Sequence, residues 1–211
     1  MVFDKFIDLT SSIPYFDMAA VVQLTDDSRR TITNQLYRWS EAGKIIQLRQ
    51  GMYTLADRYR QVTLSPAALA NNLYRPSYLS SHWALSFYGL IPDAVPVYTS
   101  ITTRTPRQFN NHFGVYSYKN IKQNFFFGYH ETLIAEGVVL LASAEKALLD
   151  LFHLTKGEWD PYRMTEMRFQ QTDLINRDLL QSYAARMGKP RISRAVETWL
   201  QAGNDEGSVE L

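Results

Sequence analysis

The residues best suited to chemistry lie between positions 28 and 43, where arginine, asparagine and threonine recur at helical spacing. Arg30 and Asn34 are one helical turn apart, so both side chains point to the same side. Arginine can bond O6 and N7 of guanine, and asparagine can bond adenine, in a major groove that accepts one helix. The face predicted to contact duplex DNA consists of Arg29, Arg30, Thr33, Asn34, Tyr37 and Arg38. Arg29 and Arg38 flank this face, where phosphate contacts are expected, and the Tyr37 ring can equally pack beneath a neighbouring segment.

A helix over residues 28–42 would position these side chains. Asp27 or Ser28 can cap its first turn, and Gly43 can take the left-handed conformation that ends it. The opposite side carries a narrow apolar stripe that can face a core. That stripe consists of Ile32, Leu36 and Trp39.

A hairpin is expected directly after this helix. Residues 45–46 and 53–55 favour strands, and they flank Arg49, Gln50 and Gly51, which form a turn signal. The tip of the hairpin thus carries Arg49 and Gln50, and Lys44 stands at its base. These three side chains complete the predicted DNA contacts.

Two short helices are expected upstream. The first has Phe3, Phe6 and Ile7 on one face. Asp17 caps the second, and residues 25–27 form a turn before the DNA-contacting helix. The inward residues of the second helix are expected to be Met18, Val21 and Val22. Residues 1–60 are therefore predicted to form a winged helix-turn-helix domain.

Composition narrows the choice of partner and compartment. The formal net charge is only +1, so DNA binding must come from a local patch and should gain from a dimer or from repeated half-sites. The absence of cysteine excludes disulfides and thiolate metal sites and agrees with a cytoplasmic location. No signal segment and no apolar run of about 20 residues occurs, so no membrane association is expected. No cofactor and no metal ion are expected.

Residues 61–202 are predicted to form a mixed α/β domain, which makes the whole chain α+β. Helices are expected at 65–74, 78–90, 142–152, 176–187 and 190–201. Strands are expected at 97–103, 113–118, 125–129 and 137–141. The acidic segment 203–211 is expected to be disordered.

Several short motifs, in this order, resemble the AbiE-type antitoxins of bacterial abortive-infection loci. The resemblance spans residues 16–201. Its motifs are Tyr37-Arg-Trp39, Gly43-Lys-Ile45, Arg49-Gln-Gly-Met-Tyr53, Tyr78-Leu-Ser-Ser-His-Trp-Ala-Leu85, Tyr88-Gly-Leu90 and Ala142-Ser-Ala-Glu-Lys-Ala-Leu-Leu-Asp150. Ala144 stands where the family usually has proline, and either residue suits the first turn of a helix.

The resemblance implies a type IV toxin–antitoxin partner. In that family the N-terminal domain binds inverted repeats at its own promoter, and the C-terminal domain counteracts a nucleotidyltransferase toxin, in several members without a stable protein complex. The matching residues of the antitoxin domain are Ser80, His82, Ser143, Glu145, Lys146 and Asp150. The resemblance assigns them no role, and a structural one is the first expectation.

Two other function classes remain open. An enzyme would use the charged cluster of Glu145, Lys146 and Asp150 with a nearby histidine, but no carboxylate spacing, phosphate loop, nucleophile elbow or histidine pair supports one. A solitary regulator would sense a ligand through the aromatic-rich stretch 83–129, although core packing of a mixed sheet explains the same residues more simply. A nucleotidyltransferase gene next to this one would favour the antitoxin.

Overall fold

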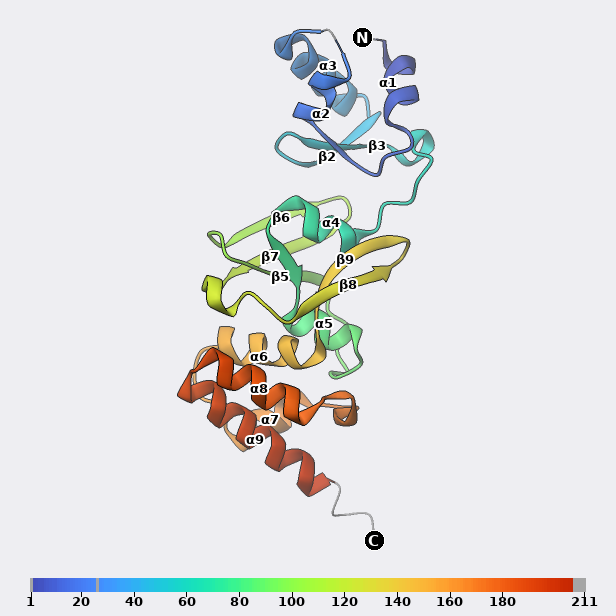
Figure 1. Cartoon of the computed structure of the whole chain (residues 1–211). Coiled ribbons are helices and arrows are strands. Elements are labelled where there is room, and N and C mark those ends of the chain that lie inside the picture. Colours follow the sequence, from blue (N-terminus) through green and yellow to red (C-terminus); the bar gives the residue numbers. More distant parts are fainter. Residues whose placement is uncertain (1, 26, 207–211) are drawn as a thin grey trace.

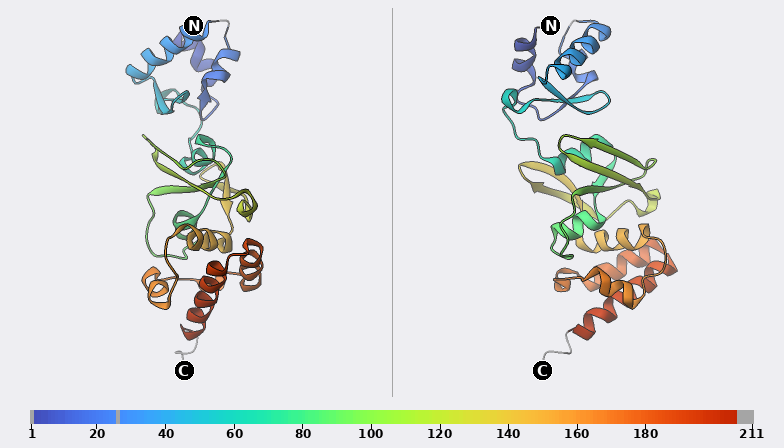
Figure 2. Two further views of the ribbon diagram at one scale, coloured as in Figure 1. Left: turned by 90° about the vertical axis from the view of Figure 1, so that its left-hand side faces the viewer. Right: turned by 180° about the vertical axis from the view of Figure 1, so that it is seen from behind.

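The computed structural model describes residues 2–25 and 27–206 and shows an α+β protein (Figure 1). Its elements stack along one long axis, with the two ends of the chain at opposite ends of the molecule (Figures 1 and 2). An N-terminal unit of helices and a small sheet comes first. A larger sheet follows, and a layer of helices completes the stack.

The N-terminal unit packs three helices over a three-stranded antiparallel sheet of order β1-β3-β2. Its helices are α1 (Phe3–Thr10), α2 (Met18–Gln23) and α3 (Arg29–Glu41), and its strands are β1 (Phe16–Asp17), β2 (Ile45–Arg49) and β3 (Met52–Leu55). Apolar faces of all three helices meet between the helices and the sheet. The buried residues there are Phe3, Phe6, Phe16, Val21, Ile32, Leu36, Ile45 and Leu55.

Local signals predicted most of this unit. The three helices and the hairpin are confirmed, and Gly43 has the expected positive φ of +61°. Two details differ. Val22 was expected to point inward but is exposed, because Val21 is buried in the core and Met18 packs against it, which leaves Val22 on the outer side of the short α2. Strand β1 was not predicted, since two residues carry too little pattern to be recognised without their partner β3.

The central unit is a six-stranded mixed sheet of order β6-β7-β5-β4-β9-β8. The pairs β5–β7 and β4–β9 are parallel, and the others are antiparallel. Helix α4 (Pro66–Leu73) lies on the side of the N-terminal unit, and α5 (Ser81–Phe87) lies on the other side (Figure 1). The strands are β4 (Ser77–Leu79), β5 (Val97–Thr102), β6 (Arg107–Asn111), β7 (Gly114–Asn120), β8 (Tyr129–Ile134) and β9 (Gly137–Ala142).

Three strand assignments of the central unit were wrong or incomplete. Residues 78–79 belong to β4 and not to a helix, because they pair with β5 and β9 in the middle of the sheet. Residues 125–127 were expected to be strand, but a short 3₁₀ helix ends at Phe125 and β8 begins only at Tyr129. Phe125 and Phe127 are nevertheless both buried. Strand β6 was missed because its residues are mostly polar and exposed.

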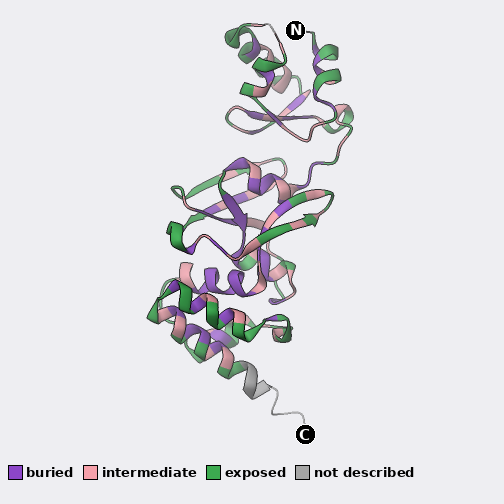
Figure 3. Cartoon of the chain, in the orientation of Figure 1, coloured by how far each residue is buried: buried purple, intermediate pink, exposed green. Residues whose placement is uncertain are grey.

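The last layer is helical. It consists of α6 (Ala144–Leu154), α7 (Pro161–Met167), α8 (Arg177–Met187) and α9 (Pro190–Glu206). Helix α6 lies under the sheet beside α5 and is covered on its far side by α8 and α9, so it is buried almost all round (Figure 3). The short α7 was not predicted.

The end of the chain is more ordered than expected. Helix α9 continues to Glu206, past the expected end at 201, so residues 203–206 of the supposed tail are helical. The rest of that segment, residues 207–211, lies outside the described residues. Within the described part of the chain, no helix has both the length and the apolar character needed to cross a membrane.

Candidate nucleic-acid interface

Helix α3 presents a polar surface from a firmly anchored backbone. The Ser28 side chain caps its start by accepting a hydrogen bond from the backbone NH of Thr31 at 3.2 Å. Ile32 and Leu36 are buried in the N-terminal core, and Trp39 packs against it. The orientation of the opposite side is therefore fixed by packing.

All six residues predicted on the contact face of α3 are exposed. Tyr37 has 65% of its surface exposed, so its ring does not pack beneath a neighbouring segment. The members of this α3 face are Arg29, Arg30, Thr33, Asn34, Tyr37 and Arg38. In Figure 3, α3 lies at the end of the molecule opposite the C-terminal helices, and its exposed residues are green.

The hydrogen-bonding capacity of the α3 face is largely unused. Thr33 donates to the carbonyl of Arg29 at 2.8 Å, and Arg38 Nε donates to the carbonyl of Asn34 at 3.4 Å. Within the part of the chain that the structure describes, neither the Arg30 guanidinium nor the Asn34 amide has a side-chain partner. Both groups are therefore available to a ligand.

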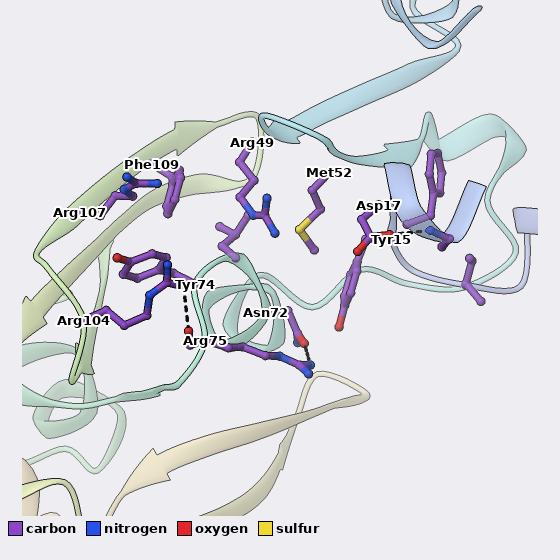
Figure 4. A pocket seen from close by; sticks show the side chains of 14 residues that line it. Tyr15, Asp17, Arg49, Met52, Asn72, Tyr74, Arg75, Arg104, Arg107 and Phe109 are labelled. Carbon is purple, nitrogen blue, oxygen red and sulfur yellow. Dashed lines mark hydrogen bonds between the residues drawn. The ribbon is translucent and has the colours of Figure 1, made fainter. Parts of the chain in front are cut away.

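The three residues predicted around the hairpin have different surroundings. Lys44 Nζ lies 4.5 Å from the centre of the Phe3 ring, at the base of the hairpin, and Gln50 is exposed at its tip. Arg49 is half-buried, donates to the carbonyl of Gln50 at 3.0 Å and points toward helix α4 and the central unit (Figure 4). The structure therefore separates Arg49 from the α3 face.

The second predicted group centres on a buried ion pair in α6. Lys146 Nζ and Asp150 Oδ1 form this pair, and neither side chain is accessible to solvent. The other carboxylate oxygen accepts hydrogen bonds from Tyr78 at 3.0 Å and from Ser80 at 2.8 Å. Burial, with the charge of Asp150 adding to it, raises the pKa of the Tyr78 hydroxyl well above its usual value, so Tyr78 remains a donor. Every charge in this network is compensated.

The remaining members of this group also hold the fold together. Ser143 caps α6 by accepting from the backbone NH of Lys146 at 3.2 Å. Glu145 accepts from the backbone NH of Asn176 at 2.9 Å, which joins α6 to the start of α8. His82 is exposed on α5 and contacts only its neighbour Ser81 among hydrogen-bonding side chains of the described chain. The group therefore does not form one accessible site.

The aromatic residues considered as a possible ligand pocket lie mostly in the core. The aromatic stretch 83–129 supplies mainly packing, because Tyr116, Tyr118 and Phe125 are fully buried. Among residues 2–25 and 27–206, no three histidine, aspartate or glutamate side chains gather where a metal ion would fit.

A cleft between the N-terminal and central units was not predicted from the sequence. Four arginines line it, and Arg49 is the only one that had been singled out. The others are Arg75, Arg104 and Arg107, which are far apart in the sequence. The pair Arg104 and Arg107 around Pro106 was the only local signal available.

Comparison with known proteins gives no assignment: no protein-family model matches the chain, and no curated protein has a matching sequence.

Proposed function

We propose that this protein binds duplex DNA through the α3 face and uses it to repress its own operon. The observation that carries the proposal is the pair Arg30 and Asn34, exposed at i, i+4 spacing without side-chain partners in the described chain, on a helix anchored by its opposite side. Such an arrangement presents two base-reading groups at a fixed separation.

In the proposed complex the N-terminal unit acts as a winged helix-turn-helix domain. Helix α3 enters the major groove, which is about 12 Å wide and accommodates a helix about 10–12 Å across with its side chains. Arg30 and Asn34 contact base edges, and Arg29 and Arg38 contact phosphates on either side. Gln50 reaches the backbone from the hairpin tip. Arg49 is left out of this interface because it points toward the central unit.

The proposal extends to an antitoxin role on the strength of the sequence resemblance to AbiE-type antitoxins. In this account the central and C-terminal layers counteract a nucleotidyltransferase toxin, and operator binding is the autoregulatory activity. The buried state of Lys146 and Asp150 supports a structural role for that motif. Antagonism of the toxin must then use exposed residues elsewhere on these layers.

Operator binding can be tested with DNA from upstream of the protein's own gene. We expect the double variant Arg30→Ala with Asn34→Ala to bind this DNA at least about thirtyfold more weakly, because each good bidentate contact contributes about 1–3 kcal/mol. A matched control is Arg58→Ala with Asn124→Ala, which removes the same residue types from exposed positions outside α3. Equal loss in the control, or none in the test variant, would exclude the α3 face.

A companion assay tests the antitoxin role in the full chain. The same α3 double variant should still rescue cells that express the cognate toxin, since its central and C-terminal layers are unchanged. Rescue without operator binding supports the division of labour. Loss of rescue by a folded variant would show that the α3 face itself mediates antagonism.

A further inference from the structure

A cleft of about 530 Å³ lies between the N-terminal unit and the central unit. Its volume is typical of pockets that enclose a small ligand. Four arginines and one aspartate line it, which gives the lining a formal charge of +3 in a protein whose net charge is only +1. We call it the arginine cleft, and its charged residues are Asp17, Arg49, Arg75, Arg104 and Arg107 (Figure 4).

The arginines come from separate parts of the fold. Arg49 belongs to the β2–β3 hairpin, Arg75 follows α4, and Arg104 and Arg107 lie between β5 and the start of β6. Asp17 caps α2 by accepting from the backbone NH of Ala20 at 2.7 Å. Among the described residues none of the four arginines forms an ion pair with a carboxylate. The concentration of positive charge is thus not balanced within the described chain.

Contacts with neighbouring groups hold three of these guanidinium groups in place. Arg104 lies 4.3 Å and Arg107 lies 5.4 Å from the centre of the Tyr74 ring, and Arg104 also donates to the carbonyl of Arg75 at 3.1 Å. Arg75 itself donates to the side chain of Asn72. Little side-chain freedom would therefore be lost on binding an anion.

Arg49 supplies the strongest sign of a missing partner. Its Nε atom is buried and has no hydrogen-bond partner among the described residues. An unsatisfied buried donor on a charged group is costly, and a bound anion is one common reason for it. In Figure 4 the Arg49 side chain extends from the hairpin into the cleft, opposite Tyr74.

The charged side chains of the lining favour phosphoryl groups, and the Tyr74 ring beside them is not available for stacking. The Tyr74 ring is already occupied by the two cations and by edge contacts with Phe109 and Tyr118, at centroid distances of 6.1 and 5.3 Å. It therefore offers no free face on which a base could stack. Guanidinium groups match the geometry of phosphate oxygens and can bind them with two parallel hydrogen bonds.

We propose that the arginine cleft binds a polyphosphate anion, either free or as the di- or triphosphate of a nucleotide. The anion would join Arg49 of the N-terminal unit to Arg104 and Arg107 of the central unit, and so fix how the two units are oriented. This site is separate from the α3 face, and the inference does not depend on DNA binding there.

The test is calorimetric titration of the full chain with inorganic tripolyphosphate, in parallel with ATP and with a duplex of unrelated sequence. We expect saturable binding of tripolyphosphate that weakens as salt is raised. Arg49→Gln and Arg107→Gln should each reduce its affinity at least about tenfold, since each removes charge-assisted hydrogen bonds. Arg107→Lys should retain part of the affinity because the charge remains without the fork geometry. Tighter binding of ATP than of tripolyphosphate would identify a nucleotide as the source of the anion.

Matched controls separate the cleft from general charge effects. Arg58→Gln and Lys122→Gln remove positive charges from exposed positions outside the cleft and should leave tripolyphosphate affinity within about twofold. Circular dichroism shows whether each variant is folded, and hydrogen exchange should slow at residues 48–52 and 104–109 when the anion binds. Absence of saturable binding, equal loss in the controls, or cleft-dependent binding of the duplex alone would overturn the proposal.

Discussion

Helices α3 and α6 each carry a pair of polar residues at the same spacing, but one pair is exposed and the other is buried. Arg30 and Asn34 in α3, and Lys146 and Asp150 in α6, both have i, i+4 spacing, so each pair lies on one side of its helix. The pair in α3 is exposed and has no side-chain partner in the described chain. The pair in α6 is fully buried and bonded to Tyr78 and Ser80 as well. Spacing alone does not distinguish a ligand-binding pair from one that stabilises the fold.

In this protein, unused binding capacity marks a candidate functional surface better than residue spacing does. Charged groups that already compensate one another inside the fold have little capacity left for a ligand. Exposed polar groups on an anchored helix can still bind a ligand, and their exposure lowers the stability of the fold very little. Substitutions in the two helices should therefore affect different properties, stability in α6 and binding in α3.

The largest effect is expected from Asp150→Ala. Removing this carboxylate leaves the Lys146 charge buried and unpaired, which should lower the free energy of unfolding by about 3–5 kcal/mol. The midpoint of thermal unfolding should fall by roughly 10 °C. Chemical and thermal denaturation followed by circular dichroism measure both.

Two controls define the cause of this loss. Replacing both partners, as Lys146→Met with Asp150→Leu, should recover part of the stability because no unpaired charge remains, while the buried hydroxyls of Tyr78 and Ser80 still lose their acceptor. Glu158→Ala breaks an exposed pair with Arg194 and should cost at most about 1 kcal/mol. A loss below about 1 kcal/mol for Asp150→Ala would refute the buried network.

A smaller loss is expected from Ser80→Ala. This change removes one hydrogen bond to the buried Asp150 carboxylate and should lower the free energy of unfolding by about 1.5–3 kcal/mol, the usual contribution of a bond to a charged group. Urea titration of the variant beside the wild-type protein provides the value. Unchanged stability would mean that Tyr78 and Lys146 satisfy the carboxylate without Ser80.

In α3, Arg29→Ala should weaken the dependence of DNA affinity on salt concentration. As a phosphate contact, Arg29 should affect operator and unrelated DNA alike, and its loss should reduce the slope of log K against log salt by about 1. Affinity measured at several salt concentrations for both DNAs gives the slope. A selective effect on the operator would instead make Arg29 a base contact.

The smallest effect on stability is expected from Tyr37→Ala. The ring is 65% exposed on α3, so its removal should change the free energy of unfolding by less than about 0.5 kcal/mol. Thermal unfolding gives this comparison directly. A loss of 2 kcal/mol or more would show that the α3 face contributes to the fold, and the contrast with α6 would no longer hold.

Local signals predicted the N-terminal unit well. The Ser28 cap, the stop at Gly43 and the β2–β3 hairpin each depend on a few neighbouring residues, which a sequence displays directly. The exposed state of the α3 face followed from helical periodicity. What could not be predicted was the direction of Arg49, because the contact of the hairpin with the central unit is tertiary.

Features set by distant residues were the ones missed. Residues 78–79 are strand because β5 and β9 flank them, and neither neighbour is visible in the local pattern. Burial of Lys146 and Asp150 depends on the covering helices α8 and α9. The arginine cleft joins residues 49, 75, 104 and 107, which only the folded chain brings together.

Fluorescence anisotropy with labelled DNA from upstream of the gene shows whether the α3 face recognises a DNA sequence. The wild-type protein should bind this DNA in preference to an unrelated duplex. Arg30→Ala with Asn34→Ala should remove that preference while the midpoint of thermal unfolding stays within about 2 °C of the wild type. A folded double variant that retains both affinity and preference would exclude the α3 face as the DNA-binding surface.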